Sequence, residues 1–213
     1  MLKYCIYYLS LLSITLSADP QNSTIKSCGM KLYDSITRIY KSDSLRIKGL
    51  SGVFNPATNN KITIAQNEWS DCVKGKSIPI LNFSTIHGKK YNTSNLKGKI
   101  LVLNFWFKAC KPCVAEMPSL NKLRNEFKGR DVIFIGFASD SENALKTTYL
   151  NSNKFLFEIV SDSKNIAKEF YFDGYPTTFI VNQTGTVVKA WTGYVHDPYA
   201  ISKPIINQLL SDF

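Results

Sequence analysis

Two cysteines separated by two residues, placed between an apolar run and a helical pattern, constrain the fold of this chain more than any other feature. Residues 99–107 are mostly branched and aromatic, and the run is short enough for a strand buried on both faces. The motif Cys110-Lys111-Pro112-Cys113 follows closely. Apolar residues then recur at helical spacing, at Val114, Met117, Leu120, Leu123 and Phe127. We therefore expect Cys110 to open a helix at the end of a buried strand.

The position at a helix start determines the chemistry expected of Cys110. Unpaired N–H groups and a positive dipole potential favour thiolate over thiol there, and Lys111 adds a nearby cation. Two intervening residues let both sulfurs meet within one turn, so Cys113 can resolve a mixed disulfide formed at Cys110. The spacing therefore favours thiol–disulfide exchange. The alternative is a zinc site completed by Cys28 and Cys72, although no second pair with this spacing exists in the chain.

The chain beyond residue 76 alternates between strand-like and helix-like patterns. Strands are expected at 78–83, 131–138, 155–160, 177–182 and 187–191, and helices around 140–149, 163–170 and 201–210. A turn at 87–90 joins the first of these strands into a hairpin. The alternation predicts an α/β fold, in which helices flank a central mixed β-sheet and a β-hairpin extension precedes it.

The composition is that of a soluble globular protein with one domain and a small addition. The chain has 213 residues, of which 44% are hydrophobic and 20% charged, and this suffices for a full core. Its formal net charge of +10 comes mostly from dispersed lysines, with no basic stripe interleaved with aromatics. We interpret the charge as a solvated basic surface and expect no nucleic-acid partner.

The first 17 residues are typical of an export signal. Lys3 precedes an apolar stretch at residues 6–16, and Thr15 and Ser17 place small residues before a cleavage point. The alternative is an uncleaved membrane anchor, although the run is short for a span. Export would place the remaining cysteines where disulfides persist.

Residues 18–75 show no strong period, and their role does not follow from the sequence. A short helix is expected at 30–40 and a strand at 61–65. Cys28 and Cys72 flank this segment. They either form a disulfide or stay free and buried, as isolated cysteines often do.

Two motifs together resemble the thioredoxin-like TlpA/ResA family, which comprises exported bacterial thiol–disulfide oxidoreductases. The first is NFWFKACKPCVAEMP at residues 104–118, and the second is GYPTTF at residues 174–179. The resemblance covers residues 76–213 and implies a thioredoxin-like domain there. Residues 18–75 form an additional small N-terminal segment outside it.

The resemblance implies roles for the site residues. Cys110 would be the exposed attacking thiol and Cys113 the buried resolving thiol, and the two would form the redox-active disulfide. Pro176 would be the cis-proline whose loop lies against this disulfide. The backbone of Tyr175 would pair with an extended segment of the substrate.

Glu116 matches the acidic residue that lies beneath the active site in ResA-like proteins, where it affects cysteine ionisation and relays a proton. The alternative for Glu116 is an exposed acid in the first turn of the helix. Lys111 and Pro112, between the cysteines, are candidate substrate contacts. Two positions depart from plain thioredoxin, because Ala109 replaces a tryptophan and Asn104 replaces a buried aspartate.

The function that the resemblance implies is reduction of disulfides in exported proteins, with apocytochrome c as a family-based candidate substrate. Electrons would come from a membrane-linked thiol donor, and the protein would act as a monomer without metal or cofactor. The expected location is the bacterial periplasm or the outer face of the inner membrane.

Two other functions stay open from the sequence. The first is a non-catalytic exported binding module, in which the Cys110–Cys113 disulfide only stabilises a helix start. The second is a peroxidase of the peroxiredoxin class. Such enzymes need Thr or Ser three residues before the reactive cysteine, where this chain has Phe107.

Overall fold

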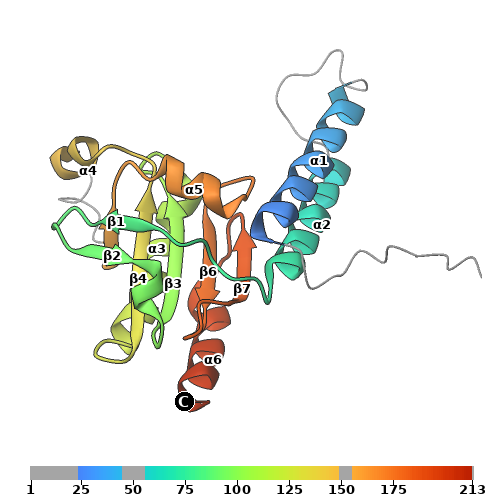
Figure 1. Ribbon diagram of the computed structural model, residues 1–213. Helices are drawn as coiled ribbons and strands as arrows, with labels where there is room; N and C mark the ends of the chain where they lie inside the picture. The colour runs from blue at the N-terminus through green and yellow to red at the C-terminus, as the bar shows by residue number, and fades with distance from the viewer. Residues whose placement is uncertain (1–23, 45–55, 149–154, 213) are drawn as a thin grey trace, which may run out of the picture.

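The computed structural model describes residues 24–44, 56–148 and 155–212 (Figure 1). The expected export signal at residues 1–17 lies outside the described residues. The helices are α1 (Ile25–Ser44), α2 (Pro56–Val73), the 3-10 helix η2 (Thr93–Leu96), α3 (Lys111–Glu126), α4 (Glu142–Thr148), α5 (Lys164–Phe170) and α6 (Pro198–Ser211). The strands are β1 (Asn82–Ser84), β2 (Lys90–Asn92), β3 (Ile100–Trp106), β4 (Val132–Ala138), β5 (Glu158–Val160), β6 (Thr177–Val181) and β7 (Val187–Thr192).

The main sheet has five strands in the order β5-β4-β3-β6-β7. Strand β3 is parallel to β4 and antiparallel to β6, so the sheet is mixed. All seven residues of β3 are buried, as expected for a central strand covered on both faces. This confirms the predicted α/β fold. β1 and β2 form a separate antiparallel hairpin.

The two faces of β3 contribute to two different hydrophobic cores, because successive side chains of a strand point to opposite faces. Leu101, Leu103 and Phe105 pack in one core, together with residues of α1, α2 and α5. Ile100, Val102 and Trp106 pack in the other, beneath α3 and α6. The helices therefore cover the sheet from both sides (Figure 1).

The N-terminal segment is helical, which corrects the strand expected at 61–65. Those residues lie inside α2, whose buried residues recur at helical spacing at Thr58, Ala65, Trp69 and Val73. The β-branched run at 62–64 resembles a strand locally, but Ile64 is half-exposed and packs in no core. Helix packing therefore overrides the local propensity.

Cys28 and Cys72 form a disulfide that joins α1 to α2. The two helices run in opposite directions and pack against each other (Figure 1). Helix α2 also packs on β7, and α1 on α5. No helix among the described residues is long and apolar enough to cross a membrane.

Replacing Cys28 and Cys72 together with alanine should lower the free energy of unfolding. The cysteines are 44 residues apart in sequence. Without the disulfide the unfolded chain gains conformational entropy, which lowers the free energy of unfolding by about 2–4 kcal/mol. Urea unfolding of the oxidised protein measures the effect. An unchanged unfolding midpoint would show that the packing of α1 and α2 does not depend on this disulfide.

Candidate active site

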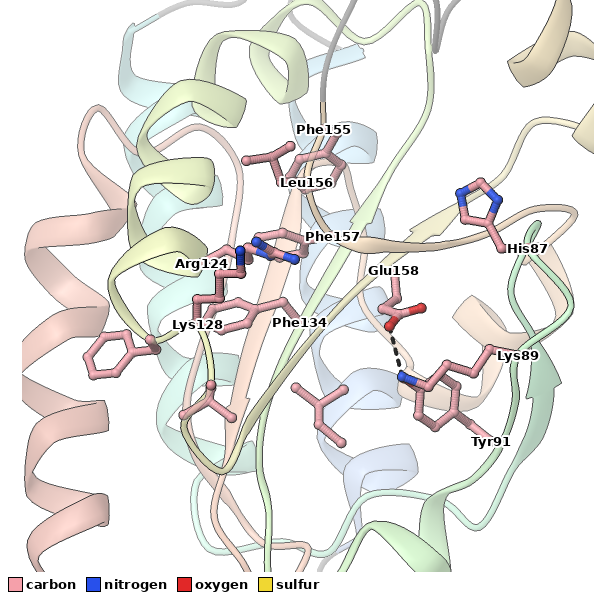
Figure 2. A pocket seen from close by; sticks show the side chains of 14 residues that line it. His87, Lys89, Tyr91, Arg124, Lys128, Phe134, Phe155, Leu156, Phe157 and Glu158 are labelled. Carbon is pink, nitrogen blue, oxygen red and sulfur yellow. Dashed lines mark hydrogen bonds and ion pairs between the residues drawn. The ribbon is translucent and has the colours of Figure 1, made fainter.

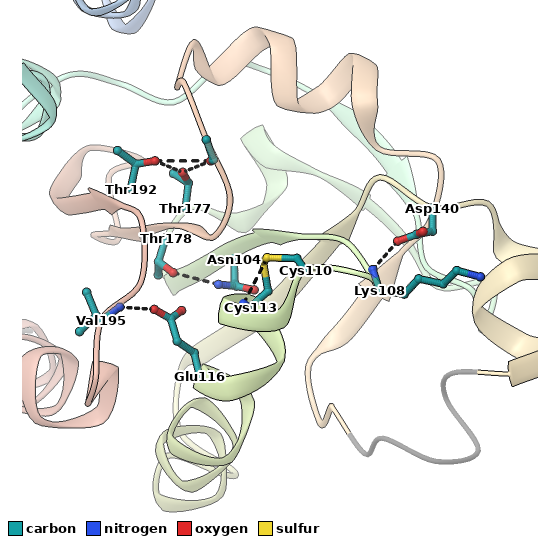
Figure 3. The surroundings of a disulfide bond; sticks show 11 residues. Asn104, Lys108, Cys110, Cys113, Glu116, Asp140, Thr177, Thr178, Thr192 and Val195 are labelled. Atoms are coloured by element: carbon teal, nitrogen blue, oxygen red, sulfur yellow. Dashed lines mark hydrogen bonds between the residues drawn. A yellow bond between two sulfur atoms is a disulfide. The ribbon is translucent and has the colours of Figure 1, made fainter. Parts of the chain in front are cut away.

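The paired cysteines lie where β3 passes into α3, as predicted. Cys110 is the N-cap residue of α3 and is disulfide-bonded to Cys113. The Cys113 amide donates a hydrogen bond to Cys110 Sγ at 3.2 Å, so this sulfur satisfies one of the free N–H groups at the helix start. Upstream, Asp140 Oδ2 accepts from the Lys108 amide at 2.7 Å and holds the loop before Cys110 (Figure 3).

The structure corrects the expectation that Cys110 is exposed. Its exposed fraction is 5%, and that of Cys113 is 2%. Cys110 Sγ is bonded to Cys113 and accepts a hydrogen bond from the first turn of α3. The residue therefore packs within the core beneath α3 and is covered. Lys111 and Pro112 are the exposed residues of the motif.

Glu116 is fully buried, which excludes the alternative of an exposed first-turn acid. It follows Cys113 by three residues and so lies on the same helical face. Its Oε1 accepts a hydrogen bond from the Val195 amide at 2.5 Å (Figure 3), whereas Oε2 is buried and has no hydrogen-bond partner among the described residues. Burial raises the pKa of Glu116 to about 7, against a smaller opposing effect of the Val195 hydrogen bond.

A neutral polar pair lies in the interior beside the cysteines. Asn104, on β3, donates from Nδ2 to Thr178 Oγ1 at 3.0 Å, and both residues are buried (Figure 3). The two face each other because Asn104 pairs with Thr178 in the register of β3 and β6. Neither side chain is titratable, so neither can accept a proton from Cys113 as a carboxylate can.

The Tyr175–Pro176 peptide bond is cis. Pro176 directly precedes β6, and Thr177 pairs with Phe105, so this loop lies at the end of the sheet where β3 leads to Cys110. The Pro176 carbonyl accepts from the Gly193 amide at 2.8 Å. The Tyr175 ring packs edge-on against Phe107, with centroids 5.4 Å apart.

A surface hollow of about 540 Å³ adjoins this loop. Its lining is Phe107, Ser139, Lys164, Ala167, Lys168, Phe172, Asp173, Gly174 and Tyr175. Its lining thus combines three aromatic residues with Lys164, Lys168 and Asp173. Such a hollow can receive a side chain of an extended segment that lies over the loop.

A second hollow, of about 460 Å³, lies near the opposite end of the sheet (Figure 2). It opens beside the start of β4 and the end of α3, and Lys89 pairs there with Glu158 at 2.9 Å. None of the described residues that line this hollow is a cysteine. Within the described residues, no group of three or more His, Cys, Asp or Glu side chains could hold a metal ion.

The structure brings together the two cysteines and Glu116, and it adds groups that the sequence analysis did not identify. These are the Val195 amide, Thr178 and Asp140. Thr178 belongs to the GYPTTF motif, but only the strand register shows that it faces Asn104. The Val195 amide carries no sequence signal, because any residue could supply it.

Comparison with known proteins gives consistent matches. Residues 74–190 match the AhpC/TSA family. The chain is 31% identical over 122 residues to thioredoxin-like protein YneN of Bacillus subtilis, covering 56% of this chain and 72% of YneN. It is also 31% identical over 135 residues to thiol-disulfide oxidoreductase ResA of Bacillus anthracis, covering 62% and 78%.

Solved structures show the same fold. A thioredoxin-family thiol:disulfide interchange protein from Chlorobium tepidum matches with a TM-score of 0.55 at 24% identity, covering 64% of this chain and 97% of that structure. The thioredoxin domain of a thiol-disulfide oxidoreductase from Bacteroides vulgatus matches with a TM-score of 0.56 at 23% identity, covering 63% and 98%. The two solved structures support the fold, and the sequence matches show that the chain belongs to the AhpC/TSA family and is a thiol–disulfide oxidoreductase of the ResA type.

Proposed function

We propose that the protein is an exported reductant of disulfides in other proteins, with catalysis in residues 76–213. The observation that carries the proposal is the Cys110–Cys113 disulfide at the start of α3, with a buried carboxyl on the same helix and the Tyr175–Pro176 loop at the same end of the sheet. A disulfide that only stabilised the start of α3 would not need a neighbouring carboxyl whose pKa is raised to about 7.

The reaction starts from the reduced dithiol. The Cys110 thiolate attacks one sulfur of a substrate disulfide, and the other substrate sulfur leaves as a thiolate. Cys113 then loses its proton and attacks Cys110 Sγ, which forms the internal disulfide and releases the second substrate thiolate. Two electrons pass to the substrate, whose thiolates take up two protons. The disulfide form of the structure is the product of this half-reaction.

Glu116 serves as proton acceptor for Cys113. A general base works best when its pKa is close to the working pH, and burial gives Glu116 a pKa of about 7. Asn104, at the position of a carboxylate in plain thioredoxin, cannot take this role. Within the part of the chain that the structure describes, Oε2 accepts no hydrogen bond, so this carboxyl oxygen can take the transferred proton.

We assign substrate binding to the surface around the Cys110–Cys113 disulfide. The backbone of Tyr175 before Pro176 would pair with an extended substrate segment, and the exposed Lys111 and Pro112 would contact it from the other side. Cys110 is nearly covered in the oxidised form, and we place the approach of the substrate to its sulfur between the Tyr175–Pro176 loop and residues 111–112.

The oxidised dithiol needs a donor of two electrons for each turnover. We assign this role to a membrane-linked thiol, with the export signal at residues 1–17 placing the protein in the periplasm or on the outer face of the inner membrane. Maturation of cytochrome c is the candidate process, and a monomer suffices for the chemistry.

Variants of the two cysteines should separate their roles. Cys110→Ser should abolish reduction of insulin disulfides, because the attacking sulfur is gone. Cys113→Ser should instead accumulate a mixed disulfide with the substrate, since no sulfur remains to release it. Mass spectrometry of alkylated samples detects the adduct. Retained insulin reduction by Cys110→Ser would contradict the proposed function.

The reduction potential of the Cys110–Cys113 pair decides the direction of electron flow. We expect a value near that of thioredoxin, roughly −270 mV, as a reductant requires. Equilibration in graded redox buffers, followed by alkylation and counting of adducts, measures it. A value near that of DsbA, roughly −120 mV, would make the protein an oxidant.

Glu116 should make the folded protein less stable as pH rises from about 4.5 to about 7. The unfolded chain releases this proton near the ordinary pKa of 4.5, whereas the folded protein keeps it until about 7. The free energy of unfolding therefore falls through this window, by on the order of 3 kcal/mol. Glu116→Gln should remove this slope from urea-unfolding data.

The matched control is Glu169→Gln, which removes an exposed carboxylate from α5 and should keep the slope. Parallel stability profiles for the wild-type protein and Glu116→Gln would show that folding does not raise the pKa of Glu116. The carboxylate would then be a much weaker base near neutral pH than the proposed proton transfer from Cys113 requires.

A further inference from the structure

Helices α1 and α2, joined by the Cys28–Cys72 disulfide, lie outside the residues that match the AhpC/TSA family. We call them the N-terminal hairpin. The proposed thiol chemistry uses none of its residues. The hairpin nevertheless contacts one functional segment directly, namely residues 171–175, which connect α5 to Pro176.

The strongest contacts are made at Tyr171. The indole Nε1 of Trp69, on α2, donates to the Tyr171 carbonyl at 3.1 Å. Trp69 is itself buried and packs edge-on against Phe179 of β6, with centroids 5.6 Å apart. On α1, Gly29 lies so close that a Cβ atom there would be 2.1 Å from the Tyr171 carbonyl oxygen. Only glycine permits this approach.

Tyr171 has a backbone conformation that needs such support. It ends α5 in the left-handed region, with φ 47° and ψ 57°. A residue with a bulky side chain adopts this region only at an energetic cost, so the surroundings must hold it there. The Trp69 hydrogen bond and the close packing of Gly29 supply that restraint.

The restraint continues toward the substrate-binding backbone. Gln66 Nε2, on α2, donates to Asp173 Oδ2 at 3.3 Å. The Phe172 ring packs against Tyr175 with centroids 5.5 Å apart. The Gly174 carbonyl accepts from Thr177 Oγ1 at 2.7 Å. The N-terminal hairpin therefore contacts the loop directly at residues 171 and 173, and packing within the loop reaches Tyr175.

We propose that the N-terminal hairpin is a positioning element for the substrate-binding loop, with Gly29, Gln66 and Trp69 as positioning residues. This inference rests on the proposed function of Tyr175 in pairing with an extended substrate. The hairpin fixes the course of residues 171–175 and thereby the backbone that a protein substrate meets. It does not touch the Cys110–Cys113 disulfide, so the reactivity of that pair stays independent of it.

The test compares a protein substrate with a small one in the full-length protein. Trp69→Phe removes the indole donor and keeps an aromatic ring at the site. It should raise KM for insulin by up to about five-fold, the limit reached if the whole free energy of the lost hydrogen bond serves to position the loop, and leave kcat unchanged. Reduction of the small disulfide 5,5′-dithiobis(2-nitrobenzoate), which needs no strand pairing, and the Cys110–Cys113 reduction potential should both stay unchanged.

A second variant tests the same inference in case Trp69→Phe does not fold. Gln66→Glu places a carboxylate opposite Asp173 near the surface and should raise KM for insulin in the same way. The exposed Asn67→Ala on the same helix is the matched control and should behave as wild type.

The outcomes separate this inference from the proposed function. Unchanged KM in both Trp69→Phe and Gln66→Glu would overturn the positioning role while the wild-type protein still reduces insulin. An equal loss of rate with insulin and with the small disulfide would also overturn it, because the defect would then be general. A wild-type protein that does not reduce insulin would refute the proposed function itself.

Discussion

The site depends on the burial of β3 between a parallel and an antiparallel neighbour. Because β3 is covered on both faces and paired along both edges, its end is fixed in space. Helix α3 starts from that end, Asp140 beyond β4 binds the connecting loop, and Pro176 directly precedes β6, the antiparallel neighbour of β3. Sheet pairing thus brings segments far apart in the sequence to the end of the sheet where the Cys110–Cys113 disulfide lies.

Burial of Glu116 determines the pKa of the carboxyl group that lies on the same helical face as Cys113. A buried carboxylate without a cation is unfavourable, and the Val195 amide compensates for only part of the lost solvation. The pKa therefore rises into the neutral range. The same carboxyl on the exposed face of α3 would stay ionised and would only interact with the helix dipole. Stability is reduced at neutral pH, and the carboxyl acquires the pKa that its proposed role as proton acceptor for Cys113 requires.

The sequence predicts well those features that local patterns determine. The strand at residues 100–106, the helix start at Cys110 and the final helix follow from apolar spacing and capping. The helix at 56–73 was missed because its β-branched residues resemble a strand, while its buried face is defined only by contacts with the sheet. The burial of Cys110 and the Val195 hydrogen bond to Glu116 depend on tertiary packing, and Val195 lies 79 residues from its partner.

Thiol chemistry and substrate binding are supported by different parts of the chain. Cys110, Cys113 and Glu116 lie on one helix, where spacing within a few residues fixes their relation. The Tyr175 backbone has no such local support, because α5 ends in a left-handed residue and the loop continues without regular structure. Contacts from α1 and α2 compensate for this lack. If the Tyr175 backbone binds substrate as proposed, changes in the N-terminal hairpin will alter the affinity for protein substrates without altering the redox properties of the cysteine pair.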